Sequence, residues 1–462
     1  MNRLFVSAAH KSSGKTTVSI GLCAALRARG EVVQPFKKGP DYIDPLWLGL
    51  AAGRSCYNLD AYLSGADELR AEFAHRMSSA TFGLVEGNKG LYDGLDLDGS
   101  NSNAALAVLL GTPVVLVLDA RGMTRGIAPL ILGYQAFDEN VRIAGVILNQ
   151  LGGARHEAKL RAVIEHYTAV PVLGAIQHDE RLTIVERHLG LVPSNESRTA
   201  SAQVEEIAGL VSAQVDLDRL LNVARSMSVL EPPPLTARVD DRASRPPGAI
   251  VRIAIARDEA FGFYYQGDLE ALCAAGAELV TFDAMRDKHL PRADGLFIGG
   301  GFPETHMDAL AANVALRGEL REAIEAGLPT YAECGGLMYL ARSVEWKGRR
   351  APMVGAVPAD IVMRDRPVGR GYVHLRETGR SPWAQGSDRP AHPIRAHEFH
   401  YSSVENLPAD AEFAYVVERG YGMDGRHDGI VRKNLLASYA HLRDVAGSRW
   451  AGRFVDFVRS RQ

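Results

Sequence analysis

Short apolar runs alternate with longer segments of helical spacing through the first half of the chain. A helical pattern extends over residues 18–29, between the first two apolar runs. The apolar runs lie at residues 4–6, 32–33, 83–85, 113–118 and 144–148. Runs that are apolar at successive positions are typical of strands buried on both faces, and strands separated by helices pair in parallel. This part of the sequence therefore predicts a parallel sheet with crossover helices.

The pattern breaks near residue 231 and then resumes. Three prolines at 232–234 open a polar stretch that is typical of a linker. A second series of strands and helices follows, with apolar runs at 251–256, 295–299 and 328–332. We therefore expect an α/β protein with two domains, residues 1–230 and 250–462, joined by a linker over residues 231–249.

Composition and charge exclude several classes of protein. The chain has 462 residues, more than one hydrophobic core usually supports, and a formal net charge of -3. That charge does not supply the basic surface of a nucleic-acid-binding domain, so we expect a small-molecule substrate. The N-terminus lacks the apolar core of a signal peptide, and no stretch is long enough to span a membrane. We therefore expect a cytoplasmic protein without a membrane partner.

The four cysteines are Cys23, Cys56, Cys273 and Cys334. They are far apart and form no C-x-x-C motif, so the sequence predicts neither a disulfide framework nor a zinc site. Cys23 and Cys273 lie within helical patterns, and we expect both to be buried structural residues.

A phosphate-binding loop is indicated at residues 9–16. The segment AHKSSGKT matches the P-loop pattern except that Ala9 replaces the first glycine. A strand leads into this loop and a helix leaves it, which aims backbone N–H groups at a bound phosphate. Lys15 would reach the outer phosphates of ATP, and the Thr16 hydroxyl would help to hold Mg²⁺. The alternative is a polar turn that binds nothing. The candidate ATP-binding residues of this loop are Ser13, Gly14, Lys15, Thr16 and Thr17.

Two further polar loops follow predicted strands. In KKGPDYIDP, Lys37 and Lys38 can neutralise phosphate charge, and Asp41 and Asp44 can contact metal or substrate, although an ordinary solvated turn has a similar composition. In EGNKGLYDG, Glu86 has the place of a carboxylate that orders Mg²⁺. Asn149, after the strand at 144–148, could read the adenine edge. Because ligands bind beyond the carboxyl ends of parallel strands, these loops together predict one site of phosphoryl transfer.

A cysteine nucleophile is indicated in the second domain. Cys334 lies between a predicted strand and helix in AECGGL, where small neighbours permit a sharp turn and the helix N-terminus favours a thiolate. Backbone N–H groups of Gly300 and Gly335 could form an oxyanion hole. The base that such a cysteine needs should come from the histidines concentrated at 397–400 and 441. The alternative is a buried structural cysteine.

The order of these motifs resembles the cobyrinic acid a,c-diamide synthase family over nearly the whole chain. The motifs are the phosphate loop, KGPDYIDP, EGNKGLYDG, GGGFPE, AECGGLMYL, HEFHYS and LASYAHL. The resemblance implies a P-loop, dethiobiotin-synthetase-like ATP domain and a class I glutamine amidotransferase domain. It also implies amidation of the a and c acetate carboxylates of cobyrinic or hydrogenobyrinic acid through an acyl phosphate, with ATP and Mg²⁺. By the same resemblance, Cys334 is the glutaminase nucleophile and His441 is its base.

The resemblance also assigns residues to the site in the first domain. Asp41, Tyr42, Asp44, Glu86 and Asp93 would line the ATP, metal and substrate site. We expect contacts with the tetrapyrrole carboxylic acid from Asp41, Tyr42, Asp44 and Asp93, with ATP from Lys37 and Asn149, and with Mg²⁺ from Thr16, Glu86 and Asp41. Ammonia released from glutamine would be protonated in bulk water, so an enclosed path between the domains is expected. A homodimer is compatible with this organisation.

The chain also departs from the family pattern. Arg443 stands two residues after His441, where typical glutaminase triads have a glutamate, so another group must orient His441. Residues 88–89 and 101–103 differ near the expected substrate crevice, which leaves sirohaem and nickel-sirohydrochlorin open as substrates. A nucleotide-switch ATPase would use the motifs of the first domain without Cys334. A binding protein with a decayed glutaminase half and an adenosylcobyric acid synthase-like enzyme are further alternatives.

Overall fold

The computed structural model describes residues 2–187, 190–225, 249–384 and 393–462. The chain divides into two compact units, Met1–Val239 and Asp240–Gln462. The division falls within the predicted linker at 231–249, which lies outside the described residues except for residue 249. None of the described helices is both long enough and apolar enough to cross a membrane.

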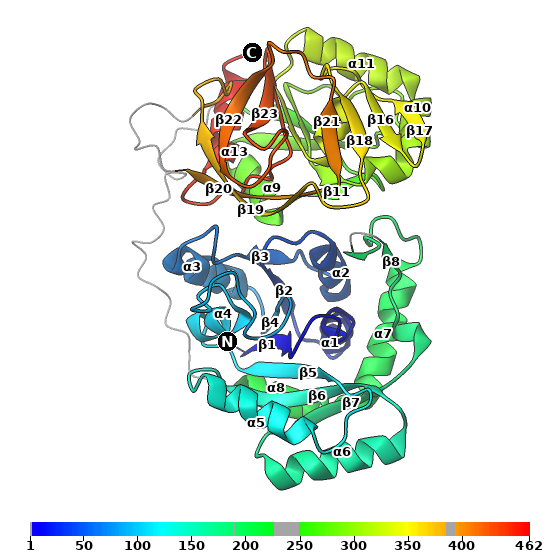
Figure 1. Ribbon diagram of the computed structural model, residues 1–462, viewed down its shortest axis with the longest axis vertical. Helices are drawn as coiled ribbons and strands as arrows, with labels where there is room; N and C mark the ends of the chain where they lie inside the picture. The colour runs from blue at the N-terminus through cyan, green and yellow to red at the C-terminus, as the bar shows by residue number, and fades with distance from the viewer. Residues whose placement is uncertain (1, 188–189, 226–248, 385–392) are drawn as a thin grey trace. The chain divides into compact units, whose positions relative to one another are not determined.

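Unit 1, Met1–Val239, is built on a seven-stranded sheet in which all neighbouring strands run parallel. The strand order is β3-β2-β4-β1-β5-β6-β7 (Figure 1). The strands are β1 (Asn2–Ala8), β2 (Val33–Lys38), β3 (Tyr57–Leu59), β4 (Phe82–Glu86), β5 (Val114–Asp119), β6 (Ile143–Leu151) and β7 (Val172–Gln177), with a separate hairpin of β8 (Glu186–Arg187) and β9 (Gly190–Leu191). The helices are α1 (Lys15–Ala28), α2 (Ile43–Ala52), α3 (Ala66–Met77), α4 (Asn103–Leu109), α5 (Ile127–Phe137), α6 (Ala154–Tyr167), α7 (Ala200–Gln214), α8 (Leu217–Arg225) and the 3₁₀ turn η1 (Glu180–Leu182).

Helices cover both faces of this sheet. One core joins the sheet to α1, α2, α7 and α8, and the other joins it to α3, α4, α5 and α6. Strands between two cores must be apolar on both sides, which is why β5 is buried at five successive positions, from Val114 to Leu118. The predicted parallel α/β architecture is confirmed for this part of the chain.

Unit 2, Asp240–Gln462, contains a nine-stranded mixed sheet in the order β12-β10-β13-β15-β24-β23-β22-β19-β20. The strands of this sheet are β10 (Val251–Ala256), β12 (Ala277–Phe282), β13 (Gly295–Ile298), β15 (Thr330–Glu333), β19 (Gly369–Glu377), β20 (Ile394–His400), β22 (Glu412–Arg419), β23 (His427–Arg432) and β24 (Leu435–Ser438). Strands β12 to β24 in this order run parallel, and the remaining strands extend the sheet in antiparallel pairs. The sequence pattern predicted β10, β13 and β15 of the parallel half and did not distinguish the antiparallel half.

Smaller elements complete this unit. A four-stranded sheet is formed by β16 (Ser343–Trp346), β17 (Arg349–Pro352), β18 (Asp360–Met363) and β21 (Ser402–Glu405), and a hairpin pairs β11 (Phe261–Phe263) with β14 (Gly300–Gly301). The helices are α9 (Gln266–Ala274), η3 (Pro303–His306), α10 (Met307–Ala312), α11 (Val314–Glu325), α12 (Gly335–Leu340) and α13 (Trp450–Arg459).

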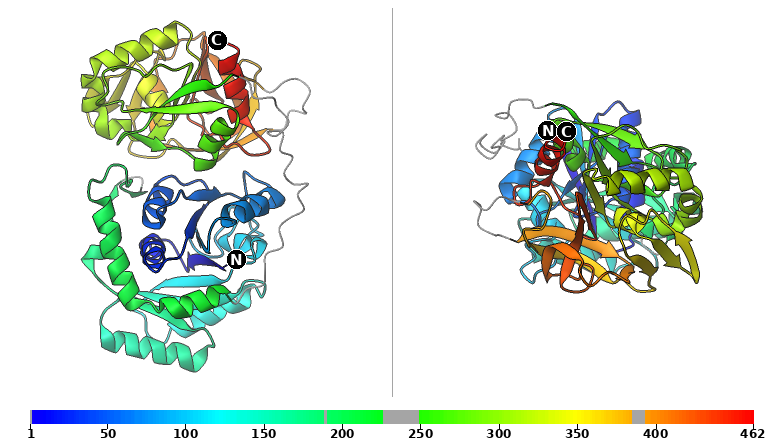
Figure 2. Two further views of the ribbon diagram at one scale, coloured as in Figure 1. Left: turned by 180° about the vertical axis from the view of Figure 1, so that it is seen from behind. Right: turned by 90° about the horizontal axis from the view of Figure 1, so that it is seen from above.

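Helices also cover both faces of the nine-stranded sheet. One face carries α9 and α13, the latter red in Figure 2, and the other carries α10 to α12 and the smaller sheet. Helix α13 buries Trp450, Phe454 and Val458, which recur every four residues along one face. Cys273 in α9 is exposed, so its prediction as a buried residue was wrong, whereas Cys23 in α1 is buried as predicted.

Candidate active sites

Three of the predicted loops of unit 1 meet at the carboxyl ends of neighbouring strands. Strand β4 lies between β1 and β2 in the sheet, and Glu86 is in register with Val6 on one side and Lys37 on the other. The phosphate loop continues from β1, and the segment containing Asp41 and Asp44 continues from β2. The parallel register therefore brings these side chains together, although they are far apart in the sequence.

Glu86, fully buried with 0% exposure, is at the centre of this cluster. Its Oε1 accepts a hydrogen bond from Thr16 Oγ1 at 2.7 Å and pairs with Lys37 Nζ at 2.9 Å. Lys37 Nζ also lies 2.5 Å from Asp44 Oδ2 and 3.9 Å from Asp41 Oδ2. We call these five residues the carboxylate cluster.

Burial and mutual interaction control the charges of this cluster. Burial disfavours the ammonium of Lys37, but Asp44, Glu86 and Asp41 together raise the pKa of Lys37 well above its ordinary value. Burial and the adjacent Asp44 raise the pKa of Asp41 to about 7. Burial also raises the pKa of Glu86. A further cation at this place would therefore favour the ionised carboxylates.

The cluster contains donor groups that suit Mg²⁺. The second carboxylate oxygen of Glu86, Oε2, is buried and has no hydrogen-bond partner in the structure. Mg²⁺ prefers carboxylate and hydroxyl oxygens and commonly takes its remaining ligands from water and substrate phosphates. Within the part of the chain that the structure describes, no three His, Cys, Asp or Glu side chains are placed to hold a metal by themselves. Oxygen atoms of Thr16, Glu86 and Asp41, with Asp44 beside them, could therefore supply some of the Mg²⁺ ligands, and a bound phosphate would supply others.

The phosphate loop is held in place by Asn149. The Asn149 Nδ2 donates to the Ser13 carbonyl at 3.0 Å, and Ser13 Oγ donates to the His10 carbonyl at 2.9 Å. Gly14 has φ 84°, and a Cβ there would lie 2.2 Å from Asn149 Nδ2, so glycine is required at this position. Helix α1 starts at the next residue, Lys15, whose pKa is lowered by burial. The Asn149 amide nitrogen thus positions the loop, and adenine recognition by this residue stays a prediction.

The two segments that depart from the family pattern lie together around Lys38. Lys38 Nζ donates to Asn88 Oδ1 at 3.3 Å and to Asn101 Oδ1 at 3.5 Å. Asn88 N donates to Asn103 Oδ1 at 3.1 Å, which joins the two segments directly. Burial lowers the pKa of Lys38 to about 8; the charge of Asp60 opposes this shift, and Lys89 and Lys37 add to it. In this Lys38 cluster, the two side-chain hydrogen bonds of the ammonium therefore go to the neutral amides of Asn88 and Asn101.

Two predicted substrate residues have structural roles as well. Asp93 Oδ2 accepts a hydrogen bond from Gly90 N at 2.8 Å, which closes the turn after β4. Tyr42 is the N-cap residue of α2, next to Asp41. Contacts of these side chains with a substrate stay predictions.

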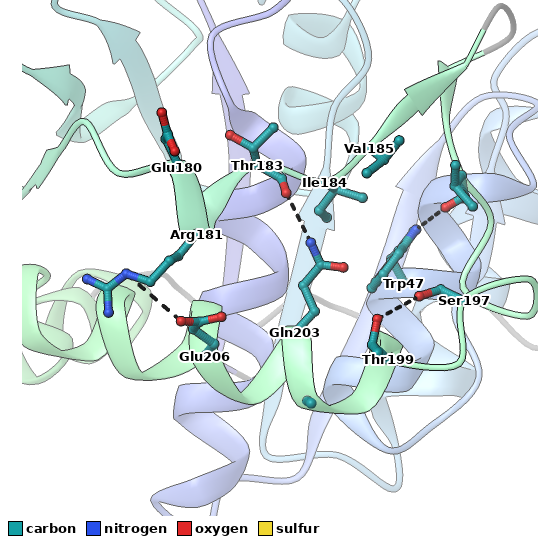
Figure 3. A pocket seen from close by; sticks show the side chains of 12 residues that line it. Trp47, Glu180, Arg181, Thr183, Ile184, Val185, Ser197, Thr199, Gln203 and Glu206 are labelled. Atoms are coloured by element: carbon teal, nitrogen blue, oxygen red, sulfur yellow. Dashed lines mark hydrogen bonds and ion pairs between the residues drawn. The ribbon is translucent and has the colours of Figure 1, made fainter.

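A cavity of about 540 Å³ lies elsewhere in unit 1 (Figure 3). Trp47 of α2, the segment around Thr183 and Gln203 of α7 contribute to its wall. Trp47 Nε1 donates to the Val192 carbonyl at 2.9 Å, and Gln203 Nε2 donates to the Thr183 carbonyl at 3.0 Å. None of the predicted binding residues lines this cavity, so we do not assign it to the nucleotide site.

Cys334 occupies a strained turn between β15 and α12 in unit 2. Its backbone has φ 48° and ψ -102°, an unusual conformation for a residue other than glycine. Its N–H donates to the Ser438 carbonyl at 2.7 Å. A Cβ at Gly336 would approach the Ile298 carbonyl oxygen to 2.2 Å, so a larger residue would obstruct the turn. This geometry is the predicted strand-to-helix elbow that presents a nucleophile.

His441 lies beside Cys334 because β24 pairs with β15. Glu333 is in register with Ser438, and His441 follows three residues later. Burial opposes a charged imidazole, but hydrogen bonds to Cys334 and Glu333 raise the pKa of His441 to about 10. The backbones of His441 and His397 also exchange hydrogen bonds of 2.7 and 3.3 Å. The structure thus brings the predicted nucleophile and the predicted base together.

Glu333 is the group at this centre that the sequence analysis missed. Its Oε2 lies 3.3 Å from His441 Nδ1, and both side chains are 4% exposed. A glutamate immediately before the cysteine was visible in the sequence. Its proximity to His441 depends on the pairing of β15 with β24, which no local pattern reveals.

The predicted oxyanion-hole glycines lie at the same centre. A Cβ at Gly300 would lie 2.7 Å from His441 Cε1, and a Cβ at Gly335 would lie 2.8 Å from Gly301 N. Gly300 and Gly301 belong to β14, which pairs with β11. Two backbone segments thus meet beside Cys334, and the role of their N–H groups stays a prediction.

Comparisons with known proteins match both units. Residues 5–192 match the CobQ/CobB/MinD/ParA nucleotide binding domain, and residues 252–444 match the CobB/CobQ-like glutamine amidotransferase domain. The chain is 46% identical to a cobyrinate a,c-diamide synthase of Magnetococcus marinus over 99% of this chain and 97% of the relative. A synthase of the same name from Methanosarcina barkeri is 39% identical over 99% of this chain and 96% of the relative. Another, from Methanosarcina acetivorans, is 41% identical over 98% of this chain and 95% of the relative.

Proposed function

The chain belongs to the cobyrinate a,c-diamide synthase family, and we propose that it converts the a and c acetate carboxylates of cobyrinic or hydrogenobyrinic acid to amides. It is a glutamine-dependent and ATP-dependent ligase. One observation carries this proposal: Cys334 in a strained elbow, with His441 beside it, belongs to the same chain as a phosphate loop facing a buried carboxylate cluster. A nucleotide switch would need only the second of these sites.

The nitrogen-releasing half uses residues of unit 2. The Cys334 thiol transfers its proton to His441, and the thiolate sulfur attacks the side-chain amide carbon of glutamine. Backbone N–H groups of Gly300 and Gly335 stabilise the oxyanion of the tetrahedral intermediate. His441 then protonates the leaving nitrogen, and ammonia departs with formation of a thioester. Water hydrolyses the thioester to glutamate and regenerates the thiol.

The activating half uses residues of unit 1. A carboxylate is a poor electrophile for ammonia, so a carboxylate oxygen first attacks the terminal phosphorus of ATP and ADP leaves. Lys15 and the backbone of the phosphate loop hold the outer phosphates. Thr16, Glu86 and Asp41, with the adjacent Asp44, would hold Mg²⁺, which neutralises phosphate charge when bound. Ammonia then attacks the carbonyl carbon of the acyl phosphate, and inorganic phosphate leaves as the amide forms.

The acid substrate needs a cation near its reacting group. The Lys38 cluster lies on the strand that leads to the segment containing Asp41, Tyr42 and Asp44. Its ammonium contacts neutral amide oxygens and can take up a substrate carboxylate without breaking a buried ion pair. We assign this position to the acetate side chains, which places the family-divergent residues Asn88 and Asn101 at the substrate.

Product analysis tests the proposed function. Purified protein is incubated with ATP, Mg²⁺, glutamine and one of three acids: cobyrinic acid, sirohaem or nickel-sirohydrochlorin. Each reaction at a carboxyl group replaces a hydroxyl by an amino group, which mass spectrometry counts. Two replacements on cobyrinic acid are expected. If only sirohaem or nickel-sirohydrochlorin is amidated, that compound is the substrate and the reaction is unchanged. If none of the three acids is amidated, the proposed substrate class is wrong.

A further inference from the structure

The residue at the usual place of the orienting glutamate cannot orient His441. Arg443 has no hydrogen-bond acceptor, so it cannot receive a proton from the imidazole. Its Nε instead lies 3.8 Å from Asp268 Oδ1, and its guanidinium stacks 4.1 Å over the Tyr265 ring. Asp268 also accepts a hydrogen bond from Asp444 N at 3.0 Å. This arrangement anchors the backbone after His441.

We propose that Glu333 is the positioning residue that orients His441, so that one strand supplies both the nucleophile and the carboxylate of the triad. Glu333 is the last residue of β15 and directly precedes Cys334. Its Oε2 faces His441 Nδ1 at 3.3 Å. Its Oε1 is held by Tyr331 Oη at 2.6 Å and by Leu442 N at 2.9 Å. The catalytic consequence rests on the glutaminase reaction proposed above.

The position of this carboxylate determines which imidazole nitrogen is available. A carboxylate at Nδ1 favours the tautomer with a proton on Nδ1, which leaves the Nε2 lone pair free to accept the thiol proton. Its negative charge also stabilises the imidazolium that results. In the part of the chain that the structure describes, titratable groups facing His441 include Glu333 at the end of β15, Cys334 directly after it, and His397 on β20. Burial and His441 lower the pKa of His397 to about 3, so His397 remains neutral and does not replace Glu333.

Backbone hydrogen bonds fix the position of Cys334 relative to the segment that leads to His441. Cys334 N donates to the Ser438 carbonyl, and Asp428 accepts hydrogen bonds from Tyr439 N at 3.0 Å and Ala440 N at 2.9 Å. The segment from Ser438 to Ala440 is therefore hydrogen-bonded to Cys334 at one end and to Asp428 at the other. A change at the Glu333 carboxyl group can alter the imidazole without moving the strand.

The substitution Glu333→Gln removes the negative charge of the side chain and nearly preserves its size and shape. A glutamine oxygen can still accept the hydrogen bonds of Tyr331 and Leu442, but its NH₂ group would face Nδ1 and favour the opposite tautomer. Glu333→Asp keeps the charge on a shorter side chain. Asp360→Asn is a matched control, because Asp360 is a buried carboxylate of the smaller sheet that pairs with Arg342.

The experiment measures alkylation of Cys334 by iodoacetamide against pH in the full chain. Peptide mass spectrometry follows the Cys334 peptide, so the other cysteines do not interfere. In the wild type, the His441 imidazolium beside Cys334 should favour the thiolate and make alkylation fast at neutral pH. In Glu333→Gln alkylation at neutral pH should be slower, Glu333→Asp should lie between the two, and Asp360→Asn should match the wild type.

Coinciding profiles for Glu333→Gln and wild type would overturn the assignment. With glutamine as substrate, we expect kcat of Glu333→Gln to fall roughly 10²–10⁴-fold with a smaller change in KM. Calorimetric unfolding shows whether each variant is folded, and a folded Glu333→Gln with wild-type kcat would contradict the proposal as well. Alkylation requires no glutamine, so a wild type with the expected profile but no glutaminase activity would contradict the proposed function alone.

Discussion

Lys37 and Glu86 stand opposite each other on the neighbouring strands β2 and β4, with Nζ and Oε1 2.9 Å apart. Both side chains are buried, and each compensates the charge of the other. Without the Glu86 charge, Lys37 would keep only Asp44 and Asp41 of the three carboxylates that now surround it. Thr16 would donate its hydrogen bond to a weaker acceptor.

We therefore expect Glu86→Gln to reduce tetrapyrrole-dependent phosphate release from ATP by roughly 10²–10³-fold, because charge at the transferring phosphoryl group is no longer balanced. Phosphate release is measured with ammonium salts as the nitrogen source, which makes the assay independent of Cys334. The control is Glu157→Gln, which removes a carboxylate of α6 that pairs with Arg161. Equal phosphate release by Glu86→Gln and the control would contradict the assignment of the carboxylate cluster.

The Lys38 cluster predicts a pH dependence of substrate binding. The pKa of Lys38 is lowered to about 8, so its ammonium is present below that pH and is lost as pH rises above it. The KM for the acid substrate should therefore increase above about pH 8, by up to about tenfold per pH unit, because the neutral amine no longer attracts a carboxylate. Lys38→Arg keeps its charge at all these pH values and should show a flat KM. A KM in the wild type that stays constant up to about pH 9 would contradict this role of Lys38.

The elbow at Cys334 predicts a stability difference between two glycines. Gly336→Ala places a Cβ 2.2 Å from the Ile298 carbonyl oxygen, which should lower the free energy of unfolding of unit 2 by about 3 kcal/mol. Gly318→Ala is the control, since a Cβ there meets no atom within 4 Å and helix α11 should gain up to about 1 kcal/mol from alanine. Differential scanning calorimetry measures both. A Gly336→Ala protein as stable as the wild type would show that the turn can widen.

The fold and the proximity of most candidate site residues could be predicted, because both follow from local patterns at strand ends. Successive apolar positions indicated strands such as β5, and the polar segments at the carboxyl ends of β1, β2 and β4 indicated Thr16, Lys37 and Glu86, which lie in α1 and at the ends of β2 and β4. The relation of Glu333 to His441 could not be predicted, because it depends on the register of β15 with β24, over a separation of 108 residues. The same holds for Lys38 and Asn101, which are 63 residues apart.

The central claim is that the chain couples release of nitrogen at Cys334 to activation of a carboxylate by ATP. The most direct measurement supplies cobyrinic acid, ATP and glutamine labelled with ¹⁵N at the side-chain amide, and compares wild type with Cys334→Ser by product mass and phosphate release. We expect ¹⁵N in each new amide of the wild-type product, with one phosphate released per amide. Cys334→Ser should form no amide from glutamine but should form it from ammonium salts. Absence of ATP cleavage by the wild type with every tetrapyrrole acid, even when ammonium salts are supplied, would contradict the account.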